Sequence, residues 1–100
     1  MLRLVKTASK TVLLAAEPKP LETSSYPCRG VLVMAPADAN GAATNSKPAW
    51  IGVSSSDGGN KIMLGVANFE GIYIPINDAS LIYVDIGADN ETVNYAIFQA

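Results

Sequence analysis

Short apolar runs recur along this chain, separated by turn residues and without helical spacing. The clearest are residues 72–76, 81–86 and 93–98, which are rich in β-branched and aromatic side chains. The segments between them, residues 77–80 and 87–90, have the Asn, Asp, Gly and Ser content of turns. We therefore expect three consecutive strands that pair as a meander.

The same criteria predict further strands earlier in the chain. These are residues 2–7, 10–16, 29–35, 49–54 and 61–66. The run at 29–35 is apolar on both faces, which is typical of a central strand. Pro75 cannot donate a ladder hydrogen bond, so its strand should be an edge or bulged. We predict an all-β fold, a small antiparallel β-sandwich or jelly-roll-like barrel of about seven to eight strands.

The organisation before residue 28 is harder to assign. Residues 17–27 contain three prolines, so we predict an extended crossing segment outside any β-ladder. We divide the chain into an extended N-terminal arm with this Pro-rich segment (residues 1–27) and a β-sandwich domain (residues 28–100). Within the sandwich we expect Trp50 to be the buried anchor of the core.

Composition favours a protein that works in an assembly. The chain has 100 residues, 49% of them hydrophobic and 16% charged, where roughly 25% charged is usual. A small domain with so few charges exposes apolar area, and exposed apolar patches mark contacts. We therefore expect a homo-oligomer or a larger assembly.

The charge is divided unevenly. Residues 1–29 hold five basic and two acidic side chains, and residues 30–100 hold two basic and seven acidic ones, so the two parts carry +3 and −5. A pI near 4.8 disfavours a nucleic-acid partner. No apolar run is long enough to span a bilayer, and the apolar part of residues 11–16 is shorter than a usual signal-peptide core.

The chain offers little catalytic equipment. It contains no His, so Ser-His-Asp and Cys-His sites cannot form from this chain alone. Two carboxylate pairs could be considered: Asp57 with Glu70, and Asp85 with Glu91. Both lie at predicted turns, where acids cap backbone groups. The fragments at 38–41 and 89–91 resemble pieces of calcium-binding loops but lack the ligand spacing of such loops. We expect no catalytic, cofactor-binding or metal-binding residue, and we expect Cys28 to be a small buried hydrophobe.

Aromatic residues leave one alternative open. Trp50, Tyr73, Tyr83, Tyr95 and Phe98 could form a platform for sugars. We favour the interpretation that the three tyrosines are cross-strand neighbours in the meander.

From Gly30 onward the chain resembles a known family. The residues that carry the resemblance are Val31-Leu32-Val33-Met34-Ala35, an Asn-containing loop, Ala49-Trp50-Ile51-Gly52-Val53-Ser54, a Gly-rich turn, Glu70-Gly71-Ile72-Tyr73-Ile74-Pro75-Ile76, Asp78-Ala79-Ser80-Leu81-Ile82-Tyr83-Val84 and Val93-Asn94-Tyr95. This pattern is similar to the small β-rich structural proteins of tailed phages, namely capsid decoration or cement proteins and related head-fibre bases.

The resemblance implies a non-enzymatic protein of the virion. It would be made in the host cytoplasm, bind the capsid exterior and hold major capsid subunits together, as a trimer or sometimes a dimer. The alternatives are a fibre, host-recognition or carbohydrate-binding β-module, and an enzyme subunit whose His comes from a partner.

We expect the contacts with the capsid or another protomer to come mainly from residues 2–16, held away from the body by the Pro-rich segment. The predicted contact residues are Leu2, Arg3, Leu4, Val5, Lys6, Lys10, Val12, Leu13, Leu14, Asn40 and Asn45.

Overall fold

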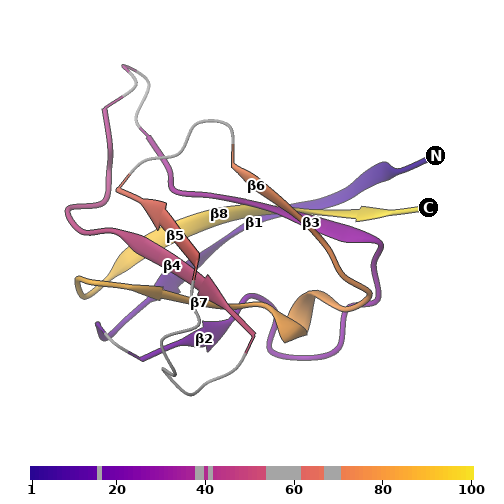
Figure 1. Cartoon of the computed structure of the whole chain (residues 1–100), viewed down its shortest axis with the longest axis horizontal. Coiled ribbons are helices and arrows are strands. Elements are labelled where there is room, and N and C mark those ends of the chain that lie inside the picture. Colours follow the sequence, from indigo (N-terminus) through magenta and orange to yellow (C-terminus); the bar gives the residue numbers. More distant parts are fainter. Residues whose placement is uncertain (16, 38–39, 41, 54–61, 67–70) are drawn as a thin grey trace.

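Two four-stranded antiparallel sheets pack face to face in this protein (Figure 1). The computed structural model describes residues 1–15, 17–37, 40, 42–53, 62–66 and 71–100. Its elements are β1 (Arg3–Val12), β2 (Lys19–Pro20), β3 (Gly30–Met34), β4 (Ala49–Gly52), β5 (Ile62–Gly65), β6 (Ile72–Pro75), the 3-10 turn η1 (Ala79–Leu81), β7 (Tyr83–Ile86) and β8 (Glu91–Gln99).

The strand order defines a jelly roll. Sheet A has the order β1-β8-β3-β6, and sheet B has the order β2-β7-β4-β5. The pairs β1–β8, β2–β7, β3–β6 and β4–β5 are nested, as in one long hairpin. The additional pairs β3–β8 and β4–β7 arise when that hairpin is rolled up. The predicted all-β fold class is confirmed: of the two alternatives, β-sandwich and jelly-roll-like barrel, the structure is a small sandwich, and its strand order is that of a jelly roll.

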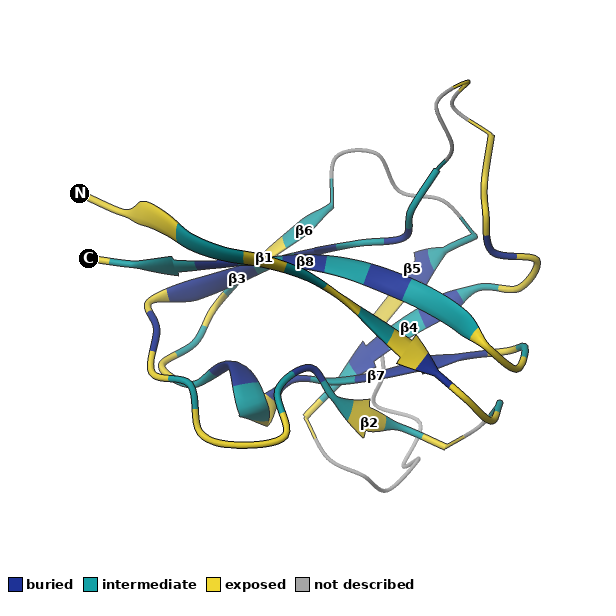
Figure 2. Cartoon of the chain, turned by 180° about the vertical axis from the view of Figure 1, so that it is seen from behind, coloured by how far each residue is buried: buried dark blue, intermediate teal, exposed yellow. Residues whose placement is uncertain are grey.

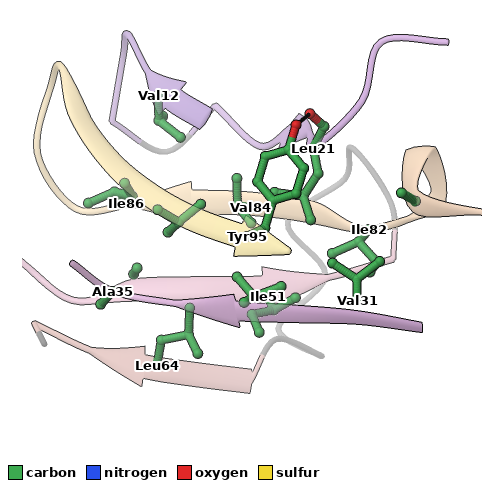
Figure 3. Packing of buried hydrophobic residues seen from close by; sticks show 14 of the residues in the cluster. Val12, Leu21, Val31, Ala35, Ile51, Leu64, Ile82, Val84, Ile86 and Tyr95 are labelled. Carbon is green, nitrogen blue, oxygen red and sulfur yellow. Dashed lines mark hydrogen bonds between the residues drawn. The ribbon is translucent and has the colours of Figure 1, made fainter. Parts of the chain in front are cut away.

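The core lies between the sheets and follows the two-residue alternation of the strands. In β8, Val93, Tyr95 and Ile97 are buried, whereas the residues between them are half-buried. Figure 3 shows how side chains from both sheets meet in this layer. The buried hydrophobic cluster comprises Val12, Leu21, Cys28, Val31, Val33, Ala35, Ala49, Ile51, Leu64, Ala79, Ile82, Val84, Ile86, Val93, Tyr95 and Ile97.

The predicted meander is wrong, although all three of its strands exist. β6, β7 and β8 do not pair with one another: β6 and β8 flank β3 in sheet A, and β7 lies in sheet B. The turns at η1 and at residues 87–90 therefore cross between sheets. The three tyrosines are separated accordingly, since Tyr73 pairs with Leu32, Tyr95 with Val33, and Tyr83 belongs to sheet B.

The predicted division at residue 27 does not match the structure. Two strands were expected in residues 2–16, but β1 is a single strand that pairs with β8 from Arg3–Gln99 to Val12–Glu91, with an irregularity at Val5. Val12 is fully buried in the core. The N-terminal segment is thus the edge strand of its own sandwich. Within the Pro-rich segment, β2 pairs with β7, so this segment also contributes a short ladder that we did not expect.

Trp50 is not the core anchor that we expected. Ala49 and Ile51 of β4 are buried and Trp50 is only half-buried, because adjacent residues of a strand point to opposite faces. The large aromatic residue of the core is Tyr95. Pro75, by contrast, lies in the edge strand β6 as predicted, and Cys28 is buried as predicted.

Comparing two substitutions tests which residues make the core. Ile97→Ala removes a fully buried side chain and should cost about 2–5 kcal/mol of unfolding free energy. Trp50→Ala should cost less, because Trp50 lies on the outer side of sheet B. Urea denaturation followed by far-UV circular dichroism measures both values. A larger loss for Trp50→Ala would contradict the assignment.

Deleting residues 1–16 should unfold the protein. The deletion removes β1, leaves one hydrogen-bonding edge of β8 unpaired and takes Val12 from the core. Circular dichroism and thermal melting provide the measurement. A truncated chain that melts cooperatively near the temperature of the full chain would show that residues 1–16 are a dispensable arm.

Candidate interaction surfaces

The acidic residues considered for catalysis have structural roles where the structure describes them. Asp85 is buried, and its Oδ1 accepts a hydrogen bond from the Ile86 amide at 2.8 Å. Glu91 accepts bonds from the amides of Ser46 and Lys47 at 2.7 and 3.2 Å. These backbone contacts hold the pKa of the Glu91 carboxyl below its ordinary value, outweighing the opposing effect of desolvation.

Other candidate acids fall outside the described residues, namely Asp38, Asp57 and Glu70. Within the described ranges no group of three or more His, Cys, Asp or Glu side chains could hold a metal ion. In the same part of the chain, no helix has the length and apolar character needed to cross a membrane.

The predicted contact residues divide into three groups by exposure. Leu2, Leu4, Leu13 and Leu14 are about half exposed or more, and Arg3 and Asn40 are also exposed. Val5, Lys6 and Lys10 are half-buried. Figure 2 shows that exposed residues gather at the two ends of β1. The structure therefore leaves the ends of this strand accessible for contacts.

Two predicted contact residues are internal. Val12 belongs to the core. Asn45 is 5% exposed, and its side chain bonds Thr92 twice: Nδ2 donates to the Thr92 carbonyl at 2.8 Å and Oδ1 accepts from the Thr92 amide at 3.1 Å. Asn45 therefore fastens the loop before β4 to β8, and its assignment as an accessible contact residue is wrong.

Lys6 also has an internal role, in a network that closes one edge of the sandwich. Its ammonium donates to Glu22 at 2.7 Å and lies 5.3 Å from the centre of the Tyr26 ring. The Tyr95 hydroxyl contacts both the Leu21 carbonyl, at 3.0 Å, and the Glu22 carboxylate. The bond to Leu21 is visible in Figure 3. The network ties β1, β8 and the segment after β2 together, and sequence spacing gave no signal for it.

The network shifts two pKa values in opposite directions. Desolvation raises the pKa of Glu22, but the bonds from Lys6 and Tyr95 and the charges of Lys6 and Lys10 outweigh it, so the pKa lies below the ordinary value. Desolvation, followed by the contact with Glu22, raises the pKa of Tyr95. Both shifts favour a charged Glu22 beside a neutral tyrosine at neutral pH.

A second acidic residue organises the crossing between β6 and β7. The Asp78 carboxylate accepts bonds from the Ser25 hydroxyl at 2.5 Å, the Tyr26 amide at 2.9 Å, and the Ser80 amide and hydroxyl at 2.9 and 2.7 Å. These donors, Ser25 first, hold the pKa of Asp78 far below its ordinary range. Asp78 caps η1 and joins it to the segment before β3.

One candidate surface is the end of the molecule from which both termini project (Figure 1). We call it the tip: Met1, Leu2, Arg3, Arg29 and Ala100. Met1, Leu2, Arg29 and Ala100 line a shallow depression of about 400 Å³. The Arg29 amide donates to the Phe98 carbonyl at 2.8 Å, which holds Arg29 on one side of β8, and Arg3 pairs with Gln99 on the other side. Residues 1–5, 27–30 and 97–100 include no acidic side chain, so the tip is apolar and basic.

A second candidate surface is the outer side of sheet A. Strand register puts the following residues on it, and we call them the sheet A face: Leu4, Thr7, Ser9, Thr11, Leu32, Met34, Tyr73, Pro75, Thr92, Asn94, Ala96 and Phe98. None of these side chains carries a charge. A groove of about 490 Å³ runs along β8, with Thr7 and Ser9 on one side and Leu32 and Met34 on the other.

Tyr73 forms the far border of this face. Its ring lies over Gly30, where any Cβ would clash with it, and it meets the Phe98 ring edge-on at a centroid distance of 5.9 Å. Tyr73 is 40% exposed. The glycine of β3 thus lets an aromatic side chain from the edge strand lie across the sheet.

Comparisons of this chain with protein-family models, with curated proteins and with solved structures found no match.

The network around Glu22 predicts a pH dependence of stability. A carboxyl whose pKa is lowered by folding stabilises the protein above its unfolded pKa, and this contribution is lost as pH falls through the folded value. The melting temperature should therefore fall as pH drops below the ordinary Glu value of 4.5. Glu22→Gln should make that fall less steep.

Glu17→Gln is the matched control, because Glu17 is exposed and lies outside the network. Differential scanning calorimetry between about pH 2 and 7 spans the titration of carboxyl groups. Equal pH profiles for Glu22→Gln and the unsubstituted protein would show that Glu22 does not contribute.

Proposed function

We propose that this protein is a structural component of a virus particle, a decoration or cement protein that binds the capsid exterior and stabilises contacts between major capsid subunits. The observation that carries the proposal is the tip, an exposed apolar and basic surface at one end of an otherwise acidic domain. Leu2 is 48% exposed there, between Met1 and Arg3.

The chemistry of the tip suits an acidic surface with apolar depressions. Arg3 and Arg29 can form bidentate bonds to carboxylates, and Leu2 can fill a pocket between them. A single small contact of this kind is weak, because exposed ion pairs contribute little each. Many copies on one particle would raise the effective strength by avidity, which matches the way a decoration protein works.

The architecture is compatible with this role. Jelly rolls occur in viral capsid proteins and in lectins, and a fold by itself does not specify a function. The resemblance of residues 30–95 to tailed-phage structural proteins favours the capsid over the lectin alternative. The acids that the structure describes serve caps and networks, which favours a non-enzymatic role.

A carbohydrate-binding module is the second candidate. Tyr73 favours it, because its partly exposed ring borders a groove that contains the polar side chains of Thr7, Ser9 and Asn94. An aromatic ring beside hydrogen-bonding groups suits a sugar. Against this candidate, the Tyr73 ring packs edge-on against Phe98, and Tyr95 is buried in the core. Glycan-array binding that Tyr73→Ala abolishes would favour this second function.

Capsid binding should depend on Leu2. Burying one leucine contributes about 1.5–3 kcal/mol, so Leu2→Asp should weaken binding by roughly tenfold or more. Leu81→Asp is the matched control: Leu81 is also 48% exposed and lies in η1, outside the tip. Co-sedimentation of each purified variant with tailed-phage particles that lack the protein measures the affinity.

The melting temperature should stay unchanged in both variants, since both leucines are exposed. Equal binding by the two variants would exclude the tip as the attachment site. If the unsubstituted protein does not sediment with particles at low salt, where charge contacts are strongest, the proposed function is wrong.

A further inference from the structure

We infer that the sheet A face is the contact surface for a second copy of this chain, in a twofold dimer whose axis runs parallel to the strands. This inference goes beyond the proposed function and does not depend on it. It assigns a partner to a surface that the capsid proposal does not use.

The absence of charge points to a partner of the same kind. The sheet A face spans four strands without one charged side chain, in a chain with sixteen charged residues. Two identical faces that carry charges of a single sign would place like charges opposite each other, which costs several kcal/mol. An uncharged face can contact its own copy without that cost, but it offers no charge complementarity to a different partner.

The ridge and the groove of the sheet A face fit those of a second copy when the twofold axis runs parallel to the strands. Across the sheet the order is β1, β8, β3, β6. The groove follows β8, where Asn94 and Ala96 are small, and the adjacent ridge follows β3 with Leu32 and Met34, continuing to Tyr73 on β6.

Consider a twofold axis in the plane of contact that runs parallel to the strands, between β8 and β3. Rotation about this axis reverses the order of the strands across the sheet. It places β3 of each copy over β8 of the other, so that the ridge enters the groove twice. An axis perpendicular to the strands would instead stack ridge on ridge. Because ridge and groove exchange roles in both halves, the contact is isologous, as a closed dimer requires.

The strand register then identifies which residues of the two copies face each other. Thr7, Ala96, Leu32 and Tyr73 form one row across sheet A. An axis parallel to the strands keeps each row opposite itself, so Leu32 of one copy faces Ala96 of the other. The Tyr73 ring, which lies over Gly30, then faces the row of Phe98 in the other copy. Both tips point in the same direction in this dimer, which would let one dimer hold one surface at two points.

The area of the sheet A face determines how strong the dimer should be. Four strands about 4.8 Å apart, with residues about 3.3 Å apart along them, give a footprint on the order of 400 Å² per copy. The total of roughly 800 Å² lies below the 1,200–2,000 Å² that is typical of stable complexes. The dimer should therefore be weak and should dissociate on dilution.

Sedimentation equilibrium of the full chain, from roughly ten micromolar to millimolar concentration, is the test, because a weak interface of this size requires concentrated protein. The mass should rise from monomer to dimer. Ala96→Lys and Leu32→Glu should each weaken the dimer by about tenfold or more, because each buries an unpaired charge in the contact. Met63→Lys, on the exposed outer side of sheet B, is the matched control and should leave the dimer unchanged.

Mixing the two charged variants tests the orientation of the axis. An equimolar mixture of Ala96→Lys and Leu32→Glu should form a heterodimer, because the introduced charges then face each other while the other half of the contact is native. If either variant fails to melt cooperatively, Thr7→Lys replaces it in the dilution series, since Thr7 is exposed on the edge strand.

Four results would overturn the inference: a monomer at every concentration, a trimer, equal weakening by Met63→Lys, or two folded charged variants that do not combine. Because no capsid is present in these measurements, they are independent of the co-sedimentation result. A dimer without capsid binding would remove the proposed function and leave this inference standing.

Discussion

The pairing of β8 with two neighbours is the constraint on which the rest of the structure depends. β8 is bonded to β1 on one side and to β3 on the other, so strands from the beginning and the end of the chain become neighbours. Its inward residues Val93, Tyr95 and Ile97 contact the core, and its outward residues form the floor of the groove. One strand therefore determines the closed core, the sheet A face and the meeting of the termini at the tip.

Polar contacts position two of the connections that pass between the sheets, the one after β2 and the one between β6 and β7. Tyr95 carries its hydroxyl through the core to Leu21 and Glu22, and Asp78 joins η1 to the segment before β3. A buried hydroxyl or carboxylate without partners would be costly, and among the described side chains no buried polar atom lacks one. These contacts add specificity to a core that is otherwise aliphatic, because they are satisfied only when the strands meet in this order.

Strand positions could be predicted from the sequence, but strand partners could not. The alternation and turn residues around 72–76, 81–86 and 93–98 placed three strands correctly, and Pro75 correctly marked an edge. Alternation does not say whether a turn stays in one sheet or crosses to the other, so the meander was wrong. The prediction that Trp50 is the inward residue of β4 was also wrong. It was based on the size of Trp50, which exceeds that of its apolar neighbours Ala49 and Ile51. Among the predicted contact residues, Val12 and Asn45 are buried. The internal bonds of Asn45 and Lys6 could not be predicted, because their partners, Thr92 and Glu22, are distant in the sequence.

The edges of sheet A explain why its face, and not an edge, is available for association. A free edge strand can recruit another chain, and proteins block it with short strands, prolines, bulges and inward-pointing charges. β1 has an irregularity at Val5, and register places Lys6 and Lys10 on its inner side. β6 contains Pro75. Because these edges are blocked, apolar side chains on the outer side of sheet A can contact a neighbouring molecule without forming a continuous sheet. The contact then closes after two copies, whereas edge pairing could continue into a fibre.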